Sequence, residues 1–196
     1  MGKQIHLSKI EALFDKSPVV DFKSVERIIG KSRVSSYAKL LLFNLLKAGK
    51  IMKIGKGVYT KHNELTLAVF SFKPAYLGLQ TSLSHHKIWE QETIPVIITT
   101  RKIRRGIRSL MGGNVLLRNI DKNNFFGVEY VLEGDFYLPY SDLEKTLIDM
   151  VVFNQKIDKE VLNKLKKRID KNKLFIYLKK YSLNVKNRVL KVLSLG

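Results

Sequence analysis

The hydrophobic and polar positions of the chain change their period twice along its length. Up to about residue 50, apolar residues recur every three or four positions, the spacing of helices with one buried face. Between residues 95 and 138, short runs rich in β-branched and aromatic residues alternate with turn signals such as GG, KNN and EGD. Helical spacing returns from Tyr140 onward. This order predicts an α+β fold in which helices flank a small sheet.

The N-terminal stretch has the element order of a winged helix-turn-helix. The spacing predicts a first helix over residues 5–15, a short second helix that stops at Gly30, and a third that starts after Ser32, whose hydroxyl can cap it. A two-stranded basic hairpin follows, with Gly55 and Gly57 at its bend. In proteins with this layout, the helix after the tight turn enters the major groove of DNA.

The helix that starts after Ser32 has an apolar and a polar face, and Gly49 is suited to end it. The residues expected to face the core are Val34, Ala38, Leu41, Leu42 and Leu45. Hydroxyls and cations on the other face suit base edges and phosphates. The candidate DNA contacts are Arg33, Ser35, Ser36 and Lys39 at the groove, with Lys53 and Lys56 of the hairpin on phosphates. The alternative is a small helical subdomain with a solvated polar face.

The chain is strongly basic, and its charge is unevenly distributed. Its 36 Lys and Arg outnumber 17 Asp and Glu, for a formal net charge of +19. Residues 1–61 hold 13 basic and 4 acidic residues, residues 62–149 hold 10 of each, and residues 150–196 hold 13 and 3. Two basic ends around a neutral middle predict a polyanionic partner, because neutralised phosphates release counterions. Double-stranded DNA is the partner we expect.

A membrane surface is the competing polyanion, and only the charge supports it. The chain has no run of about 18 apolar residues and no hydrophobic N-terminal signal. The sequence has no cysteine, which excludes disulfides, thiolate zinc sites and cysteine catalysis. We therefore expect a cytoplasmic protein that does not act at a membrane.

Charge and periodicity change together near residues 61–64, where we place a domain boundary. The winged helix-turn-helix is predicted over 1–62, and a second domain over 63–196, with a sheet over about 95–138 and helices over about 141–195. The elements expected before the last helices are helices over 65–72 and 80–89 and strands over 96–100, 115–118, 126–132 and 137–139.

The C-terminal stretch is predicted to be helical and basic. Ser141 followed by Glu144 three positions later is typical of a capping box at a helix start. The tail over 158–195 is expected to form two amphipathic helices with a break near residues 170–172. Its predicted apolar face consists of Leu174, Leu178, Tyr181, Val185, Val189 and Val192.

Five cations follow the strand expected over 96–100, and they form a candidate second nucleic-acid contact. These residues are Arg101, Lys102, Arg104, Arg105 and Arg108. Arginine suits bidentate phosphate contact, so a loop carrying them could bind DNA beside the winged helix, or RNA. The alternative is a solvated turn partly paired with Glu90 and Glu92.

No set of residues forms a convincing catalytic or metal site. His85 and His86 are adjacent and cannot face the same way on a helix, so we expect packed or hydrogen-bonded histidines. Asp142, Glu144 and Asp149 suggest a metal-dependent nuclease only weakly, because a capping role is available to Glu144. Phosphate-binding glycine loops and nucleophile elbows are absent from the sequence. We expect no cofactor, no metal and no enzymatic activity.

Several local strings, in order, resemble the AbiEi-type antitoxin family, also called AbiEi transcriptional regulators. The resemblance runs from about residue 20 to the C-terminus and depends on the order and spacing of the strings rather than on any one. The strings are Gly57-Val58-Tyr59, the run LQTSLSHH over residues 79–86, Phe125-Phe126-Gly127, and the run SDLEKTLID over residues 141–149. Thr146 stands where the family commonly has Ala.

The resemblance implies a negative autoregulator of a two-gene operon whose second gene encodes a nucleotidyltransferase-like toxin. It implies an N-terminal winged helix that binds DNA and a C-terminal domain that carries antitoxicity. As a type IV antitoxin, the protein would oppose the toxin without forming a stable complex with it. One short helix per subunit favours two copies on operator repeats, about 34 Å or a multiple apart.

Three other functions remain open alternatives. An RNA-binding protein would use the arginine-rich loop and the basic tail. A metal-dependent nuclease would depend on Glu144. A protein-interaction module would use the helix-turn-helix shape without DNA.

Overall fold

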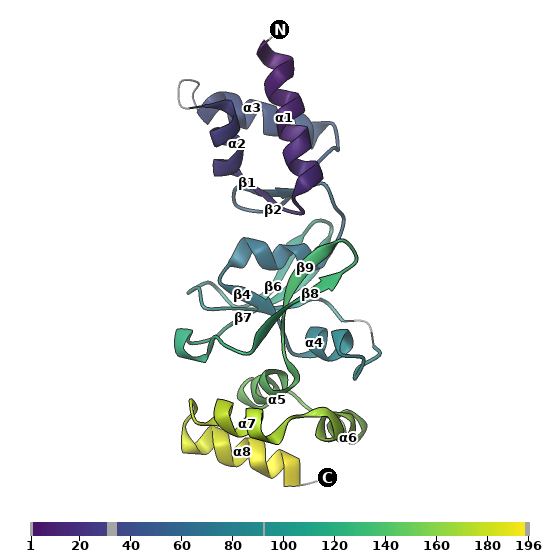
Figure 1. The fold of residues 1–196 in the computed structure, drawn as a ribbon, viewed down its shortest axis with the longest axis vertical. Helices are drawn as coiled ribbons and strands as arrows, with labels where there is room; N and C mark the ends of the chain where they lie inside the picture. Colours follow the sequence, from purple (N-terminus) through teal and green to yellow (C-terminus); the bar gives the residue numbers. More distant parts are fainter. Residues whose placement is uncertain (1, 31–34, 92, 195–196) are drawn as a thin grey trace. The chain divides into compact units, whose positions relative to one another are not determined.

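The computed structural model describes residues 2–30, 35–91 and 93–194, and the chain forms two compact units. One unit comprises residues 1–71 with 109–114, and the other comprises 72–108 with 115–196. The fold is α+β, as predicted, with N-terminal helices and a small wing-like sheet, a six-stranded mixed sheet, and C-terminal helices (Figure 1).

Three helices and a small sheet make up most of the first unit. They are α1 (Gly2–Lys16), α2 (Phe22–Ile29), α3 (Ser35–Lys47), β1 (Val20–Asp21), β2 (Met52–Gly55) and β3 (Val58–Thr60). The strands pair antiparallel in the order β1-β3-β2. The three helices and the basic hairpin are confirmed, whereas the two-residue strand β1 was not predicted. The helix expected over 65–72 is the 3-10 helix η1 (Leu65–Phe72).

Local chemistry explains where these helices start and stop. The Asp21 carboxylate accepts a hydrogen bond of 2.7 Å from the Ser24 N–H and caps α2, and Gly30 ends that helix with a φ of 87°. Gly49, with a φ of 67°, follows α3. The predicted helix ends at Gly30 and Gly49 are therefore confirmed, while Ser32 lies outside the described residues.

The larger sheet is mixed, in the order β6-β7-β5-β4-β9-β8. Its strands are β4 (Ala75–Leu77), β5 (Val96–Thr99), β6 (Gly106–Leu110), β7 (Gly113–Asn119), β8 (Val128–Glu133) and β9 (Phe136–Ser141). β5 pairs parallel with β7, and β4 pairs parallel with β9. Two strands were missed: β4 has three buried residues and no alternation, and β6 lies in the arginine-rich segment expected to be a loop.

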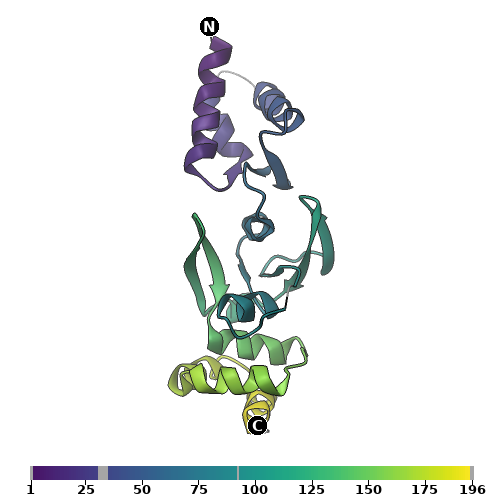
Figure 2. The same cartoon turned by 90° about the vertical axis from the view of Figure 1, so that its right-hand side faces the viewer.

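The described residues of the second unit also form the helices α4 (Gln80–His85), α5 (Leu143–Val152), α6 (Lys159–Arg168), α7 (Lys171–Leu178) and α8 (Leu183–Ser194). Helix α5 lies between the sheet and the layer formed by α6, α7 and α8 (Figures 1 and 2). That position explains why eight consecutive residues of α5, 144–151, are buried. Among the described residues, no helix is both long and apolar enough to cross a bilayer.

Three details of the helix predictions were wrong. The N-cap of α5 is Asp142, whose carboxylate accepts the Lys145 N–H at 2.7 Å, because Ser141 is the last residue of β9. The tail forms three helices, since the chain also breaks between Leu178 and Leu183. The helix expected over 80–89 ends at His85, and the Ile88 N–H turns back to the Leu83 carbonyl.

Candidate nucleic-acid interface

Helix α3 turns one face to the core of the first unit and the opposite face to solvent. The core face is confirmed for Ala38, Leu41, Leu42 and Leu45, which are all buried. Ser36 and Lys39 are exposed near the N-terminal end of the helix, as the DNA-binding interpretation requires. Ser35 is half-buried at the side of the helix. Arg33 and Val34 lie outside the described residues.

The outward face of α3 also carries apolar residues that the sequence interpretation missed. Leu40 is 53% exposed and Phe43 is 60% exposed. Together with Ser36 and the exposed Lys47, they occupy positions 36, 40, 43 and 47, which recur every three or four residues. The signal was available in the sequence, since this second stripe lies opposite the first. Apolar groups on such a face suit the thymine methyl group in the major groove.

The hairpin presents two of its basic side chains to solvent. Lys53 on β2 and Lys56 at the turn are both exposed, and Gly57 closes the turn with a φ of 70°. Lys50 and Lys61, by contrast, form ion pairs of 2.7 Å with Glu11 and 2.6 Å with Asp15 of α1. Lys39, Lys53 and Lys56 have no ion pair within the part of the chain that the structure describes.

These ion pairs divide the cations of the first unit into two groups. Lys50 and Lys61 tie the ends of the hairpin to α1, while no carboxylate of the described residues pairs with Lys39, Lys53 or Lys56. Uncompensated, solvated ammonium groups are the ones that can neutralise phosphates and release counterions. The arrangement can therefore attract a polyanion without first breaking an internal ion pair.

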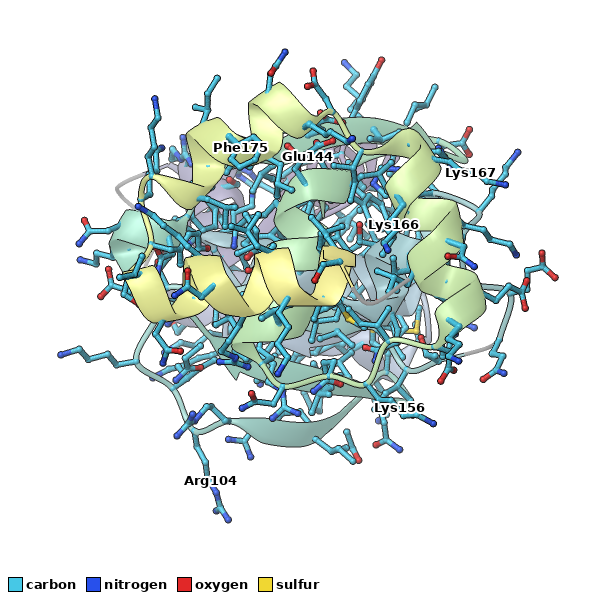
Figure 3. All side chains as sticks on the ribbon, turned by 90° about the horizontal axis from the view of Figure 1, so that it is seen from below. Arg104, Glu144, Lys156, Lys166, Lys167 and Phe175 are labelled. Carbon is cyan, nitrogen blue, oxygen red and sulfur yellow. The ribbon has the colours of Figure 1, made fainter. Side chains whose placement is uncertain are left out.

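The arginine-rich segment is not a single loop. Arg101, Lys102, Arg104 and Arg105 are exposed in the connection after β5, but Arg108 lies on β6 and is half-buried. Its guanidinium donates a hydrogen bond of 3.1 Å to the Arg104 carbonyl. The Arg104 side chain extends away from the body of the second unit (Figure 3). Four cations of this segment are therefore exposed to solvent.

The strings of the second unit that carry the AbiEi resemblance meet around the start of α5. The Ser82 hydroxyl donates to the Ser141 carbonyl at 2.7 Å and lies 2.9 Å from the Thr146 hydroxyl. The His86 Nε2–H donates to the same carbonyl at 3.0 Å. Burial lowers the pKa of His86, so the ring is neutral near pH 7. These contacts join α4 to the β9–α5 junction and confirm a hydrogen-bonded role for His86.

Gly127, in a third of these strings, also packs against the start of α5. Its φ is 64°, and a Cβ there would lie 2.8 Å from the Lys145 Cβ and 3.0 Å from the Tyr177 ring. The Gly127 carbonyl also accepts the Asp142 N–H at 2.9 Å. Only glycine tolerates this conformation at so close an approach without strain. The Phe125-Phe126-Gly127 string is therefore needed for packing against α5.

A buried ion pair lies beneath Gly127. Lys145 donates to Asp149 one turn further along α5, and both side chains are inaccessible to solvent. The Tyr76 hydroxyl donates to the second Asp149 oxygen at 2.6 Å, and Lys145 also lies 3.2 Å from the Tyr181 hydroxyl. The ammonium sits 5.4 Å from the centre of the Phe126 ring.

The surroundings of this pair shift the pKa values of both of its members. Burial lowers the pKa of Lys145 and raises the pKa of Asp149, while their mutual attraction opposes both shifts. Burial, followed by the charge of Asp149, raises the pKa of Tyr76 well above its usual range. Since solvent does not reach the pair, it holds α5 to the sheet and to the α7–α8 turn rather than meeting a substrate.

The carboxylates that suggested a nuclease are engaged with neighbouring groups. Lys173 of α7 lies 3.0 Å from Asp142, 3.2 Å from Glu144 and 3.5 Å from Glu129. Glu144 also accepts the N–H of Asp170, the N-cap residue of α7, at 2.8 Å, so the capping-box role predicted for it in its own helix is not what the structure shows. No group of three potential ligands in the described ranges could hold a metal ion.

The comparisons with known proteins support the fold. A crystal structure of the RV2827C protein from Mycobacterium tuberculosis, a protein of AbiEi-like fold, matches with a TM-score of 0.64. The match covers 97% of this chain and 76% of that chain at 14% sequence identity. No protein-family model and no curated protein sequence matches the chain. At this identity the likeness concerns the fold alone.

Proposed function

We propose that this chain is a DNA-binding transcriptional repressor and the antitoxin of a type IV toxin–antitoxin operon. The observation that carries the DNA-binding half is the set of exposed cations Lys39, Lys53 and Lys56, none paired with a carboxylate among the described residues. They lie on the helix and hairpin that approach DNA in winged helix-turn-helix proteins. A DNA-binding role also implies a cytoplasmic protein.

In this proposal, α3 supplies the sequence preference and the hairpin supplies affinity. Ser36 and Lys39, with the half-buried Ser35, reach base edges and nearby phosphates at the N-terminal end of α3. Arg33, which lies outside the described residues, stays a contact proposed from the sequence alone. Leu40 and Phe43 continue the exposed face and can contact thymine methyl groups. Lys53 and Lys56 neutralise phosphates, which makes binding depend on salt. Two copies on operator repeats give useful specificity from one short helix each.

The antitoxin half of the proposal rests on the resemblance to the AbiEi-type family. By that resemblance, the second unit opposes a nucleotidyltransferase-like toxin without a stable complex. The test is to express the adjacent gene with and without this chain. Growth arrest by the neighbour alone, relieved by this chain, supports the proposal, and a neighbour that leaves growth unchanged contradicts it.

Binding titrations test the DNA-binding half. The chain is titrated with duplexes from the region upstream of its own gene, with random duplexes and with a structured RNA hairpin, each at several salt concentrations. We expect the upstream duplex to bind most tightly and all duplex affinities to fall as salt rises. Equal and salt-insensitive affinities would contradict the proposal.

RNA binding is the second candidate, and the exposure of Arg101, Lys102, Arg104 and Arg105 supports it. It predicts tighter binding to the hairpin than to any duplex in the same titration. We further propose a binding protein and not an enzyme, since Glu144 is occupied by Asp170 and Lys173. Divalent-dependent cleavage of nucleic acid that Glu144→Ala abolishes would overturn this.

A further inference from the structure

We propose that the second unit binds a nucleoside phosphate in the hollow at the carboxyl ends of strands β5 and β7. The two strands are parallel neighbours, with Thr99 paired to Asn119, so their following segments leave the same edge of the sheet. Residues 100–103 and 119–123 from these segments line a hollow of about 1070 Å³. In open parallel sheets, crevices outside the carboxyl ends of the strands are the usual ligand sites, and β5 and β7 form such a parallel pair.

The charges around the hollow favour an anion. Arg101, Lys102 and Lys122 line it, against one carboxylate, that of Asp121. Asp121 is already engaged, because it accepts the Asn123 N–H at 2.8 Å. Three cations around one opening suit phosphate oxygens, which arginine can contact with two parallel hydrogen bonds.

The interior of the hollow suits a flat, partly polar group. Ile103, Ile120 and Phe125 provide an apolar surface, and Phe125 is backed by Tyr76 at 5.6 Å between ring centres. Aromatic faces of this kind stack on nucleobases whatever their sequence. A phosphate at the cationic opening and a base against Phe125 would together occupy a site of this composition.

Asn119 adds a group that a base can recognise. Its Nδ2 donates to the Ile103 carbonyl at 2.7 Å. Its Oδ1 is inaccessible to solvent and has no hydrogen-bond partner among the described atoms. A buried acceptor without a partner costs free energy, so a rotation of the amide that brings Oδ1 to a ligand donor would be favoured. The exocyclic amino group of adenine or cytosine is such a donor, so AMP is the probe we choose.

The site is held in shape before a ligand arrives. The Ile120 N–H donates to the Thr99 carbonyl at 2.9 Å, and the Arg101 N–H donates to the Thr99 hydroxyl oxygen at 3.1 Å. These bonds fix both lining segments to the ends of the strands. The inference does not depend on duplex DNA binding by the first unit, because all lining residues belong to the second.

Calorimetric titration of the full-length protein tests the proposal with AMP, adenosine and inorganic phosphate. We expect one AMP per chain, bound at least about tenfold more tightly than either fragment, because only AMP fills both parts of the site. Dinucleotides with a 5′-phosphate or a 5′-hydroxyl test whether the ligand is the 5′ end of a nucleic-acid strand or a free nucleotide. If the 5′-phosphorylated dinucleotide binds more tightly than AMP, the ligand is a strand end. If it binds equally or more weakly, the ligand is a free nucleotide.

Matched variants locate the site. Lys122→Glu and Asn119→Leu should each weaken AMP binding about tenfold or more. Lys167→Glu makes the same charge change as Lys122→Glu on an exposed side chain of α6 that does not line the hollow (Figure 3), and it should change affinity less than about twofold. Thermal unfolding of each variant checks its folding. If Asn119→Leu does not fold, Lys122→Glu alone tests the site, because Lys122 is exposed. Absent AMP binding, or equal losses in Lys167→Glu and Lys122→Glu, overturns the proposal.

Discussion

Lysine side chains have opposite environments in the two units of the molecule. In the first unit, Lys53 and Lys56 are exposed on a hairpin and unpaired with any carboxylate in the described ranges. In the second, Lys145 is fully buried and held by Asp149 and three aromatic rings. The same ammonium group is exposed to solvent in the first unit and part of the core in the second.

The comparison shows how to separate a binding motif from a folding motif. Residues that meet a partner keep their polar groups unsatisfied and solvated until the partner arrives. Residues such as Ser82, Asp142 and Lys145 have their polar groups satisfied within the chain. The AbiEi-like strings of the second unit are thus explained by packing, and its function is to be sought at exposed positions.

The largest expected effect comes from breaking the buried ion pair. Lys145→Met leaves the Asp149 carboxylate buried without its cation and should lower the free energy of unfolding by about 3–5 kcal/mol. Chemical denaturation measures the change. Adding Asp149→Asn to Lys145→Met should recover part of the loss, because an amide still accepts the Tyr76 hydroxyl proton.

The control for that experiment is Lys156→Met, which removes a lysine whose side chain is 91% exposed (Figure 3). It should change stability by less than about 0.5 kcal/mol. If Lys145→Met lowered the free energy of unfolding as little as Lys156→Met, the buried pair would not hold the second unit together. The contrast between buried and exposed lysines would then fail.

The next effect concerns the hairpin cations. Lys53→Glu or Lys56→Glu should weaken binding to all duplexes alike and reduce the slope of log affinity against log salt by roughly one unit per lost contact. Titration against upstream and random duplexes measures both quantities. Lys9→Glu makes the same charge change at an exposed position of α1 and should leave the slope nearly unchanged. Equal slopes in all variants would exclude the hairpin from the interface.

A smaller and more selective effect is expected at α3. Ser36→Ala removes a hydroxyl at the groove and should change the preference among upstream duplexes by about 1 kcal/mol, while random duplexes bind as before. Ser8→Ala on α1 is the matched control at another exposed serine. A uniform loss on every duplex would place Ser36 on the phosphate backbone instead of the bases.

The smallest effect is a dependence of stability on pH in the second unit. Burial lowers the pKa of His86 from 6.5, and a hydrogen bond with His85 is the main cause of the lowered pKa of Glu133. Both groups bind protons more tightly when unfolded, so stability is full above about pH 6.5 and falls with acidification. The melting temperature should decline as the pH is lowered from 7.5 to 5. His86→Gln should make the decline below pH 6.5 smaller. A rise in stability with acid would contradict this.

The sequence was sufficient for the parts of the fold with strong local signals. Helices with one apolar face, the glycines at 30, 49 and 57, and the exposed hairpin lysines were all predictable from spacing and backbone preference. Strand β4 was not, because its three residues are all buried and show no alternation. The cap of α5 was not predictable either, because the sequence does not show that β9 continues to Ser141.

The candidate sites were predictable only where the signal lies within one element. Exposure of Ser36 and Lys39 follows from helical spacing within one element. The hollow beside Arg101 and Lys122 depends on two strands becoming parallel neighbours, although their lining segments are separated in the chain. Pairing of that kind leaves no periodic signal in the sequence, so only the cations of the first segment could be recognised.

Site-directed crosslinking tests the central claim, that the outward face of α3 and the hairpin contact duplex DNA, most directly. Because the sequence has no cysteine, Ser36→Cys, Lys53→Cys and Lys9→Cys each give one labelling site for a photo-crosslinker. We predict efficient crosslinking of the upstream duplex from positions 36 and 53 and little from position 9. Crosslinking that is strongest from position 9, or absent from position 36, would contradict the account.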